Sequence, residues 1–136
     1  MLGKLAYLFR GFQKEITMSK EVSIAMQLVF FIGFLALLCS IVYGVVAKDI
    51  MAEGSIMLDV YWGQFTFIDI YIAFIVFYLW IVFRQKSVLK NIVWFFLIML
   101  GGSMTILLYL FLAARGCDNS WGKFIAGERL EKIKHE

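Results

Sequence analysis

The segment QFTFIDIYIAFIVFYLWIVF, residues 64–83, decides the fold of this chain. It is almost entirely apolar, and about 20 such residues are needed for a helix to cross the hydrocarbon core of a bilayer. Asp69 is its only strongly ionisable residue. Because a charged side chain at the centre of a spanning helix costs roughly 2.5–3.5 kcal/mol on insertion scales, this carboxylate is a functional hypothesis from the start.

Two further segments, 22–46 and 92–114, are also long and apolar enough to span a bilayer. Charged residues mark the ends of all three segments: Lys20 and Glu21, Lys48 and Asp49, Arg84 and Lys86, Lys90, and Arg115. The pattern predicts an all-α, three-span transmembrane bundle that forms a single membrane domain over residues 1–136.

The composition agrees with a membrane location. Hydrophobic residues make up 62% of the 136 residues and charged residues only 17%, whereas soluble domains have about 45–50% and about 25%. The net charge of +3 is small and scattered, so a nucleic-acid partner is excluded. The lipid bilayer is the expected environment.

Residues 1–18 predict an amphipathic helix in the membrane interface. Apolar residues recur there at three- and four-residue spacing, and basic residues fall on the other side: Leu2, Leu5, Phe9, Phe12 and Ile16 against Lys4, Arg10 and Lys14. Ser19 and Glu21 then supply a capping residue and a first-turn acid for the first span. Residues 118–136 are expected to form a polar, partly helical tail.

The distribution of basic residues predicts the orientation. The N-terminal arm and the connection 84–91 are basic, whereas the connection 47–63 holds Lys48 against three acids. The positive-inside rule therefore places the N-terminus in the cytoplasm, and 47–63 and the C-terminus outside, in what we expect to be a bacterial inner membrane. The basic residues of the tail run against an exported C-terminus.

Aromatic residues are expected to anchor the spans at the two interfaces. Tyr61, Trp62 and Trp121 are predicted at the outer interface, and Trp80 and Trp94 at the inner one.

Straight antiparallel helices would bring polar residues together near Asp69. Tyr109 and Thr105 of the third span, and Ser40 and Tyr43 of the first, are expected at its depth. One interpretation makes Asp69 a proton-titrating or ligand-binding group that accepts hydrogen bonds from these side chains. The other makes it a structural carboxylate that joins helices. The sequence leaves both open.

Small residues interrupt the third span at Gly101, Gly102 and Ser103, and we expect them to allow close packing of helices. Packing is also the expected role of Cys39.

Asp49, Glu53 and Asp59 are expected to be solvated, since no calcium-loop spacing accompanies them. No metal site and no cofactor is predicted.

Several catalytic chemistries are excluded by the residues that the spans lack. The only histidine is His135, beside the C-terminus, so no bis-histidine haem, zinc site or histidine-based triad can be built inside the bundle. The spans also lack a pair of carboxylates for general acid and base.

Residues 61–113 resemble a family of small bacterial and plant integral membrane proteins described only as a domain of unknown function. The matching residues are Trp62 and Gly63 before a helix with Asp69 and Tyr71, then a basic turn and a helix that starts near Trp94. The resemblance implies no activity.

Three functions follow as hypotheses. The first is a non-enzymatic subunit or accessory factor of a membrane assembly, as a homo-oligomer or with a larger membrane-protein partner. The second is a carrier or lipid- or solute-binding protein in which Asp69 titrates. The third is an intramembrane enzyme that modifies a lipid.

Overall fold

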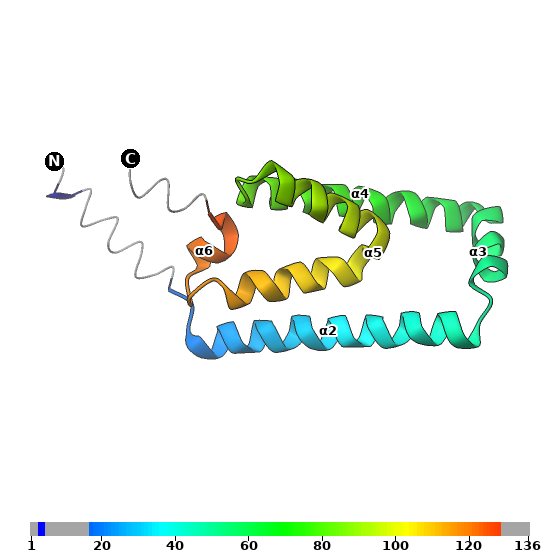
Figure 1. Cartoon of the computed structure of the whole chain (residues 1–136), viewed down its shortest axis with the longest axis horizontal. Helices are drawn as coiled ribbons and strands as arrows, with labels where there is room; N and C mark the ends of the chain where they lie inside the picture. Colours follow the sequence, from blue (N-terminus) through cyan, green and yellow to red (C-terminus); the bar gives the residue numbers. More distant parts are fainter. Residues whose placement is uncertain (1–2, 5–16, 129–136) are drawn as a thin grey trace.

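The structure is a computed structural model, and it describes residues 3, 4 and 17–128. Five helices follow one another in the range 17–128: α2 (Lys20–Ala47), α3 (Ile50–Asp59), α4 (Tyr61–Arg84), α5 (Val88–Arg115) and α6 (Trp121–Ala126). The predicted interfacial helix falls almost entirely outside the described residues, as does the end of the tail. Figure 1 shows α2 and α4 running lengthwise, with α3 across one end.

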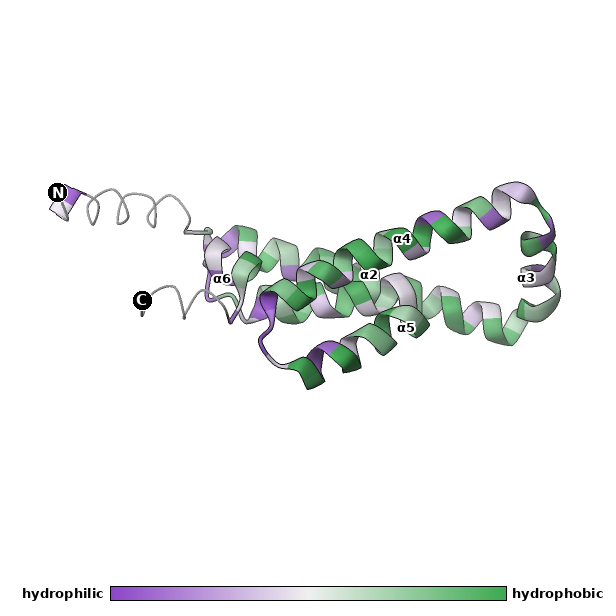
Figure 2. Cartoon of the chain, turned by 90° about the horizontal axis from the view of Figure 1, so that it is seen from above, coloured by the Kyte–Doolittle hydropathy of each residue, from purple (hydrophilic) through white to green (hydrophobic). Residues whose placement is uncertain are grey.

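The predicted all-α bundle with three long apolar helices is confirmed, because α2, α4 and α5 each have the length along the chain and the composition of a membrane-crossing helix. The predicted span boundaries fall within these helices. Ser19 caps α2 by accepting a hydrogen bond from the Val22 amide at 3.3 Å, and Glu21 lies in the first turn, as predicted. Figure 2 shows hydrophobic residues along most of the three helices and hydrophilic ones in the α4–α5 turn.

The connection between α2 and α4 contains a helix that the sequence analysis missed. Asp49 caps α3 by accepting from the Met51 and Ala52 amides at 3.1 and 3.2 Å. At the C-terminal end of α3, Gln64 Nε2 donates to the Leu58 carbonyl at 2.8 Å. The last carbonyls of a helix have no amide partner within the helix, so this side chain supplies the hydrogen bond. Gly63 is required there, because a Cβ at this position would overlap the Met57 carbonyl.

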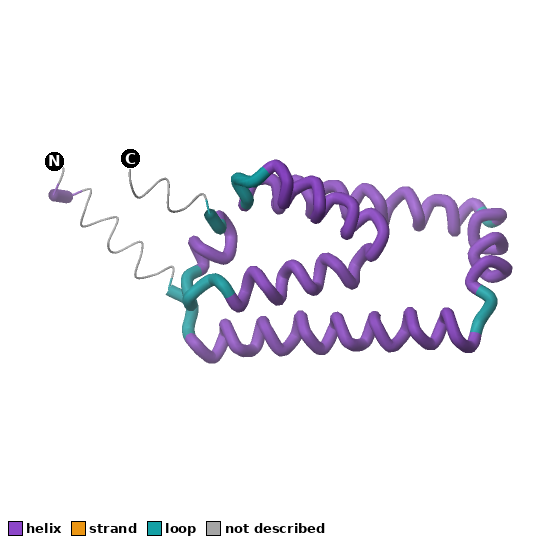
Figure 3. Tube along the Cα trace, viewed as in Figure 1, coloured by secondary structure: helices purple, strands orange, loops and turns teal. Residues whose placement is uncertain are grey.

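The third apolar helix departs from the predicted straight course. Gly102 has φ 56° and ψ −138°, which is not helical. The rings of Trp94 and Tyr109 lie 4.8 Å apart between centroids, although 15 residues of straight helix would separate them by roughly 22 Å. Helix α5 is therefore a hairpin of two antiparallel arms, 88–101 and 103–115, and Figure 3 shows the reversal in the trace.

Each arm of α5 is roughly 20 Å long at 1.5 Å per residue, which is shorter than the roughly 30 Å hydrocarbon core. The tip lies beside the middle of α4, since a Cβ on Gly102 would be 3.1 Å from the Phe74 ring. The arm 103–115 lies against α2, where a Cβ on Gly33 would be 3.1 Å from Leu107. The reversal places both arms on one half of the bundle.

The buried core lies between the two arms and α4. It consists of Phe74, Ile81, Ile98, Tyr109 and Ala113. Cys117 is also buried, and its Sγ donates to the Ala114 carbonyl at 2.9 Å. Cys39 is exposed on α2, so the packing role that the sequence suggested for it is wrong within the single chain.

The reversal brings the described ends of the chain together. Met18 N donates to the Asn119 carbonyl at 2.8 Å, and Thr17 pairs with Ser120. We call the end that holds residues 17–20, the turn 85–87 and α6 the junction end, and the end that holds α3 the far end. The expected placement of the tail opposite the N-terminus does not fit this fold, because a chain that turns back at Gly102 returns to its starting side.

We predict that Gly102→Val lowers the free energy of unfolding by about 1–3 kcal/mol, because a β-branched residue is strained at positive φ. Gly44→Val is the matched control, since a Cβ at Gly44 meets nothing within 4 Å. The measurement is unfolding by sodium dodecyl sulfate in mild detergent. Equal effects of the two variants would contradict the hairpin.

Candidate functional site

Asp69 lies on α4 beyond the tip of the α5 hairpin. It precedes the buried Phe74 by five positions, which at 100° per residue places the two side chains roughly 140° apart around the helix. The Asp69 side chain is exposed, and no hydrogen bond or ion pair to its carboxylate is found within residues 17–128. It therefore points away from the core that α4 shares with α5.

The polar cluster expected around Asp69 does not form. Ser40 donates its hydroxyl to the Ala36 carbonyl of its own helix at 2.9 Å, and Tyr43 is 64% exposed. Thr105 donates to the Leu97 carbonyl on the opposite arm of the hairpin at 2.9 Å. Tyr109 lies at the junction end beside Arg84. Thr105 and Tyr109 miss the depth of Asp69 because α5 turns back before reaching it.

The reversal also regroups the tryptophans. Trp80 and Trp121 both contact Phe124 of α6, with ring centroids 6.0 and 6.2 Å from its ring. Trp121 thus lies at the junction end with Trp80 and Trp94, instead of at the interface of Trp62 as expected. Trp62 is 72% exposed at the start of α4, where an interfacial anchor belongs.

The best-connected polar group of the described chain is the Arg84 guanidinium. Its Nε donates to the Phe124 carbonyl at 2.9 Å, and Nη2 to the Lys123 carbonyl at 3.4 Å. These carbonyls belong to the last turn of α6, which carries partial negative charge, and the Lys123 carbonyl also accepts from the Gly127 amide at 2.9 Å. Arg84 therefore acts as a cationic cap that holds α6 against the end of α4.

Aromatic side chains surround the same guanidinium. Nη1 donates to the Tyr109 hydroxyl at 3.2 Å, and the guanidinium carbon lies 5.5 Å from the Tyr109 ring centroid and 5.8 Å from that of Trp80. Gln85 Nε2 also donates to the Tyr109 hydroxyl, at 3.3 Å. Tyr109 is only 2% exposed, so its hydroxyl joins the polar site to the core.

Glu128 closes the site by pairing with residues around the α4–α5 turn. Its Oε1 accepts from Lys90 Nζ at 3.1 Å, and Oε2 accepts from the Lys86 amide at 3.3 Å. The Lys90 hydrogen bond, followed by that from Lys86, holds the pKa of Glu128 below its ordinary value of 4.5. The pairing is thus complete above pH 4.5 and is lost as the pH falls through the lowered pKa.

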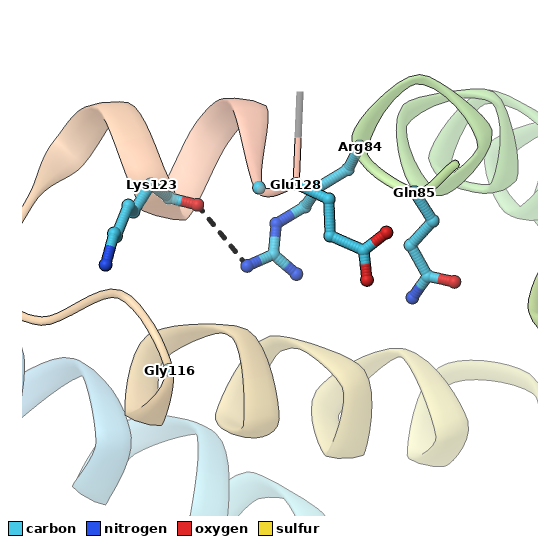
Figure 4. Close-up of a pocket in the computed structure, with 6 residues that line it drawn as sticks. Arg84, Gln85, Gly116, Lys123 and Glu128 are labelled. Atoms are coloured by element: carbon cyan, nitrogen blue, oxygen red, sulfur yellow. Dashed lines mark hydrogen bonds between the residues drawn. The ribbon is translucent and has the colours of Figure 1, made fainter. Parts of the chain in front are cut away.

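A cavity of about 240 Å³ opens among these side chains. In Figure 4 the Arg84 guanidinium, the Gln85 amide and the Glu128 carboxylate extend toward the space between α4, α5 and α6. The lining residues are Arg84, Gln85, Gly116, Lys123, Gly127 and Glu128. Gly127 has φ 53°, and a Cβ there would overlap the Arg84 side chain, so glycine allows α6 to end against Arg84.

A comparison with family models, curated proteins and solved structures finds no match. Function therefore has to be inferred from geometry and charge. Within the described residues, no group of three or more His, Cys, Asp or Glu side chains could hold a metal ion.

The sequence analysis placed Arg84 and Lys90 only as charged flanks of the spans, and it missed their common site. Two signals pointed to it. Gly101 and Gly102 adjoin each other in mid-helix, where a reversal is possible, and the tail contains Lys and Arg residues, which disfavour export.

We predict that Arg84→Lys loosens α6, because a single ammonium cannot reproduce the planar guanidinium fork on two carbonyls and a hydroxyl. Hydrogen bonds of charged groups contribute about 1.5–3 kcal/mol each, so amide exchange over 121–128 is expected to become about tenfold faster or more. Hydrogen exchange with mass spectrometry measures it. Lys48→Arg at the far end is the control, and exchange unchanged in Arg84→Lys would remove Arg84 as the cap of α6.

Proposed function

We propose that this protein is a non-enzymatic integral membrane subunit or accessory factor. The observation that carries the proposal is Asp69, an exposed carboxylate in an apolar helix that finds no partner within residues 17–128. Such a group inside a membrane requires a polar or charged partner. The proposed partner is a second copy or a larger membrane protein.

The apolar surface around Asp69 supports the same proposal. The α5 hairpin ends beside Phe74, so it covers the junction half of α2 and α4 and leaves their far halves without it. Exposed apolar residues there include Val42, Val46, Phe65, Ile68 and Ile72. Lipid accepts such a surface, whereas Asp69 in its midst favours a protein partner.

We further propose that the junction end faces the cytoplasm of a bacterial inner membrane. Seven basic residues occur between 17 and 128, and six of them belong to the segments of the junction end: Lys20, Arg84, Lys86, Lys90, Arg115 and Lys123. Lys48 alone lies at the far end. Positive charge is retained on the cytoplasmic side, so residues 48–60 are placed outside.

This orientation predicts which engineered cysteines a membrane-impermeant thiol reagent can reach. In a Cys39→Ser, Cys117→Ser background, Ser55→Cys in α3 is expected to react in intact cells, and Glu128→Cys only after the membrane is permeabilised. Labelling of both in intact cells would place the two ends on the same side of the membrane and contradict the fold.

In-cell crosslinking with mass spectrometry tests the subunit proposal. We expect a stoichiometric protein partner with the wild type and at least about tenfold less with Asp69→Asn, because removing one partner of a desolvated charged pair costs several kcal/mol. Asp59→Asn, in α3, is the matched control. A strictly monomeric protein with no crosslinked partner would contradict the proposal.

The same experiment separates the alternative of a carrier or of a lipid- or solute-binding protein. In that case the wild type retains a small molecule that Asp69→Asn loses, and no protein partner is captured. The exposure of Asp69 supports this alternative as second choice, because a titrating group must be accessible. An intramembrane lipid-modifying enzyme ranks below it, since the Asp69 carboxylate has no hydrogen bond or ion pair to a second acid, base or nucleophile within residues 17–128.

A further inference from the structure

A stripe of exposed side chains runs along α4 on the side opposite the α5 hairpin. Its members follow one another at steps of four and three residues in turn: Phe65, Asp69, Ile72, Val76 and Leu79. At 100° per residue, all five lie roughly 140–180° around the helix from the buried Phe74. The four apolar members are 51–62% exposed, and Asp69 is exposed as well. We call these five residues the Asp69 stripe.

The geometry of the Asp69 stripe fits a second helix. Toward the junction end, Phe77, Trp80 and Ile81 belong to the core or pack against it, whereas Val76 and Leu79 of the stripe stay exposed. Steps of three and four residues average 3.5, which is the repeat along which two helices pack in a left-handed pair. Most helix pairs in membranes have this hand. The spacing therefore indicates a membrane-spanning helix as the occupant.

The position of Asp69 sets the chemistry of that helix. Asp69 follows the first residue of α4, Tyr61, by eight positions, which is roughly 12 Å along the helix axis. An aspartate side chain is too short to carry its charge that far to the interface, whereas Lys and Arg have long stems that do so. Because the Asp69 carboxylate has no hydrogen bond or ion pair within residues 17–128, a group outside this range has to compensate its charge.

A second copy of the chain does not supply the opposite charge from its described residues. Copies in one membrane share one orientation, so each presents the same residues at the same depth. Six of the seven Lys and Arg residues between 17 and 128 belong to the junction end, and Lys48 lies at the far end, just beyond α2. Two Asp69 stripes that face each other would place carboxylate against carboxylate, and like charges repel strongly at low dielectric.

We propose that the Asp69 stripe binds a spanning helix of a different membrane protein, and that this helix carries a Lys or Arg that pairs with Asp69. The inference rests on the proposed subunit function and names the partner. Ionisable residues inside membranes commonly pair with one another, and an ammonium or guanidinium donates charge-assisted hydrogen bonds to the carboxylate. The apolar members of the stripe then pack against the same helix on both sides of the pair.

Synthetic spanning helices test the chemistry of the partner. The full chain carries a dye at Ser55→Cys in the Cys39→Ser, Cys117→Ser background and is reconstituted in phosphatidylcholine vesicles. Energy transfer measures its association with labelled helices of about 20 leucine and alanine residues. The helices differ at a single position, about eight residues from one end, which holds Lys, Gln or Leu.

We expect the Lys helix to associate about tenfold or more tightly than the Gln and Leu helices, because a charge-assisted hydrogen bond is stronger than a neutral one. Equal association of the Lys and Gln helices would overturn the proposal, since the stripe would then not select a charge.

Variants of the stripe separate charge from packing. Asp69→Asn is expected to lose the preference for the Lys helix, and Asp69→Glu, which keeps the charge, is expected to retain it. Ile72→Ala is expected to weaken association about threefold or more through lost packing. Ile75→Ala is the matched control, because Ile75 is 48% exposed but lies outside the stripe. An unchanged preference in Asp69→Asn, or equal effects of the two alanine variants, would overturn the proposal.

Crosslinking from the stripe in cells distinguishes this inference from the proposed function. The photoreactive residue p-benzoylphenylalanine is placed at Val76, and crosslinked peptides are identified by mass spectrometry. A spanning segment of another protein whose Lys or Arg, when changed to Leu, abolishes the crosslink supports the inference. A second copy, or a spanning segment without a basic residue, overturns the inference and leaves the subunit proposal standing. If no protein is crosslinked, both are overturned.

Discussion

The backbone of Gly102 is the constraint on which the rest of the structure depends. Only glycine adopts φ 56° with ψ −138° at little cost, and this single conformation converts one long apolar helix into two short antiparallel arms. The two arms then hydrogen-bond to each other. Thr105 donates to the Leu97 carbonyl near the tip, so a side chain of the second arm is bonded to the backbone of the first within the apolar region.

Arg84 can cap α6 only because the second arm returns to the junction end. The cap in turn fixes the described part of the tail beside the start of α2, where Met18 and Asn119 join through their backbones. A guanidinium suits this role, since it stays charged at all relevant pH values and engages several carbonyls in one plane. The aromatic rings of Trp80 and Tyr109 shield it, which lowers the local dielectric and strengthens its hydrogen bonds.

The sequence predicted the features that depend on residue type along the chain. Helix boundaries and the Ser19 cap follow from length, hydropathy and charged flanks, and all are local properties. The reversal at Gly102 escaped prediction because glycine tolerates both a helical and a reversed conformation, and hydropathy is the same in either case. A straight α5 would put Tyr109, Thr105 and Trp121 at depths that the reversal at Gly102 changes. Asp69 stands out in the sequence by its residue type alone, whereas its direction around α4 required the position of the core.

The gathering of polar segments at one end bears on how the chain enters a membrane. Of the described connections, only residues 48–60 lie at the far end. They carry one basic residue and three acids. A helical pair, α2 and α4, can therefore insert as a unit with a single short segment to translocate. The hairpin can then enter from the junction end by burying its apolar arms, and residues 116–128 do not have to cross the hydrocarbon.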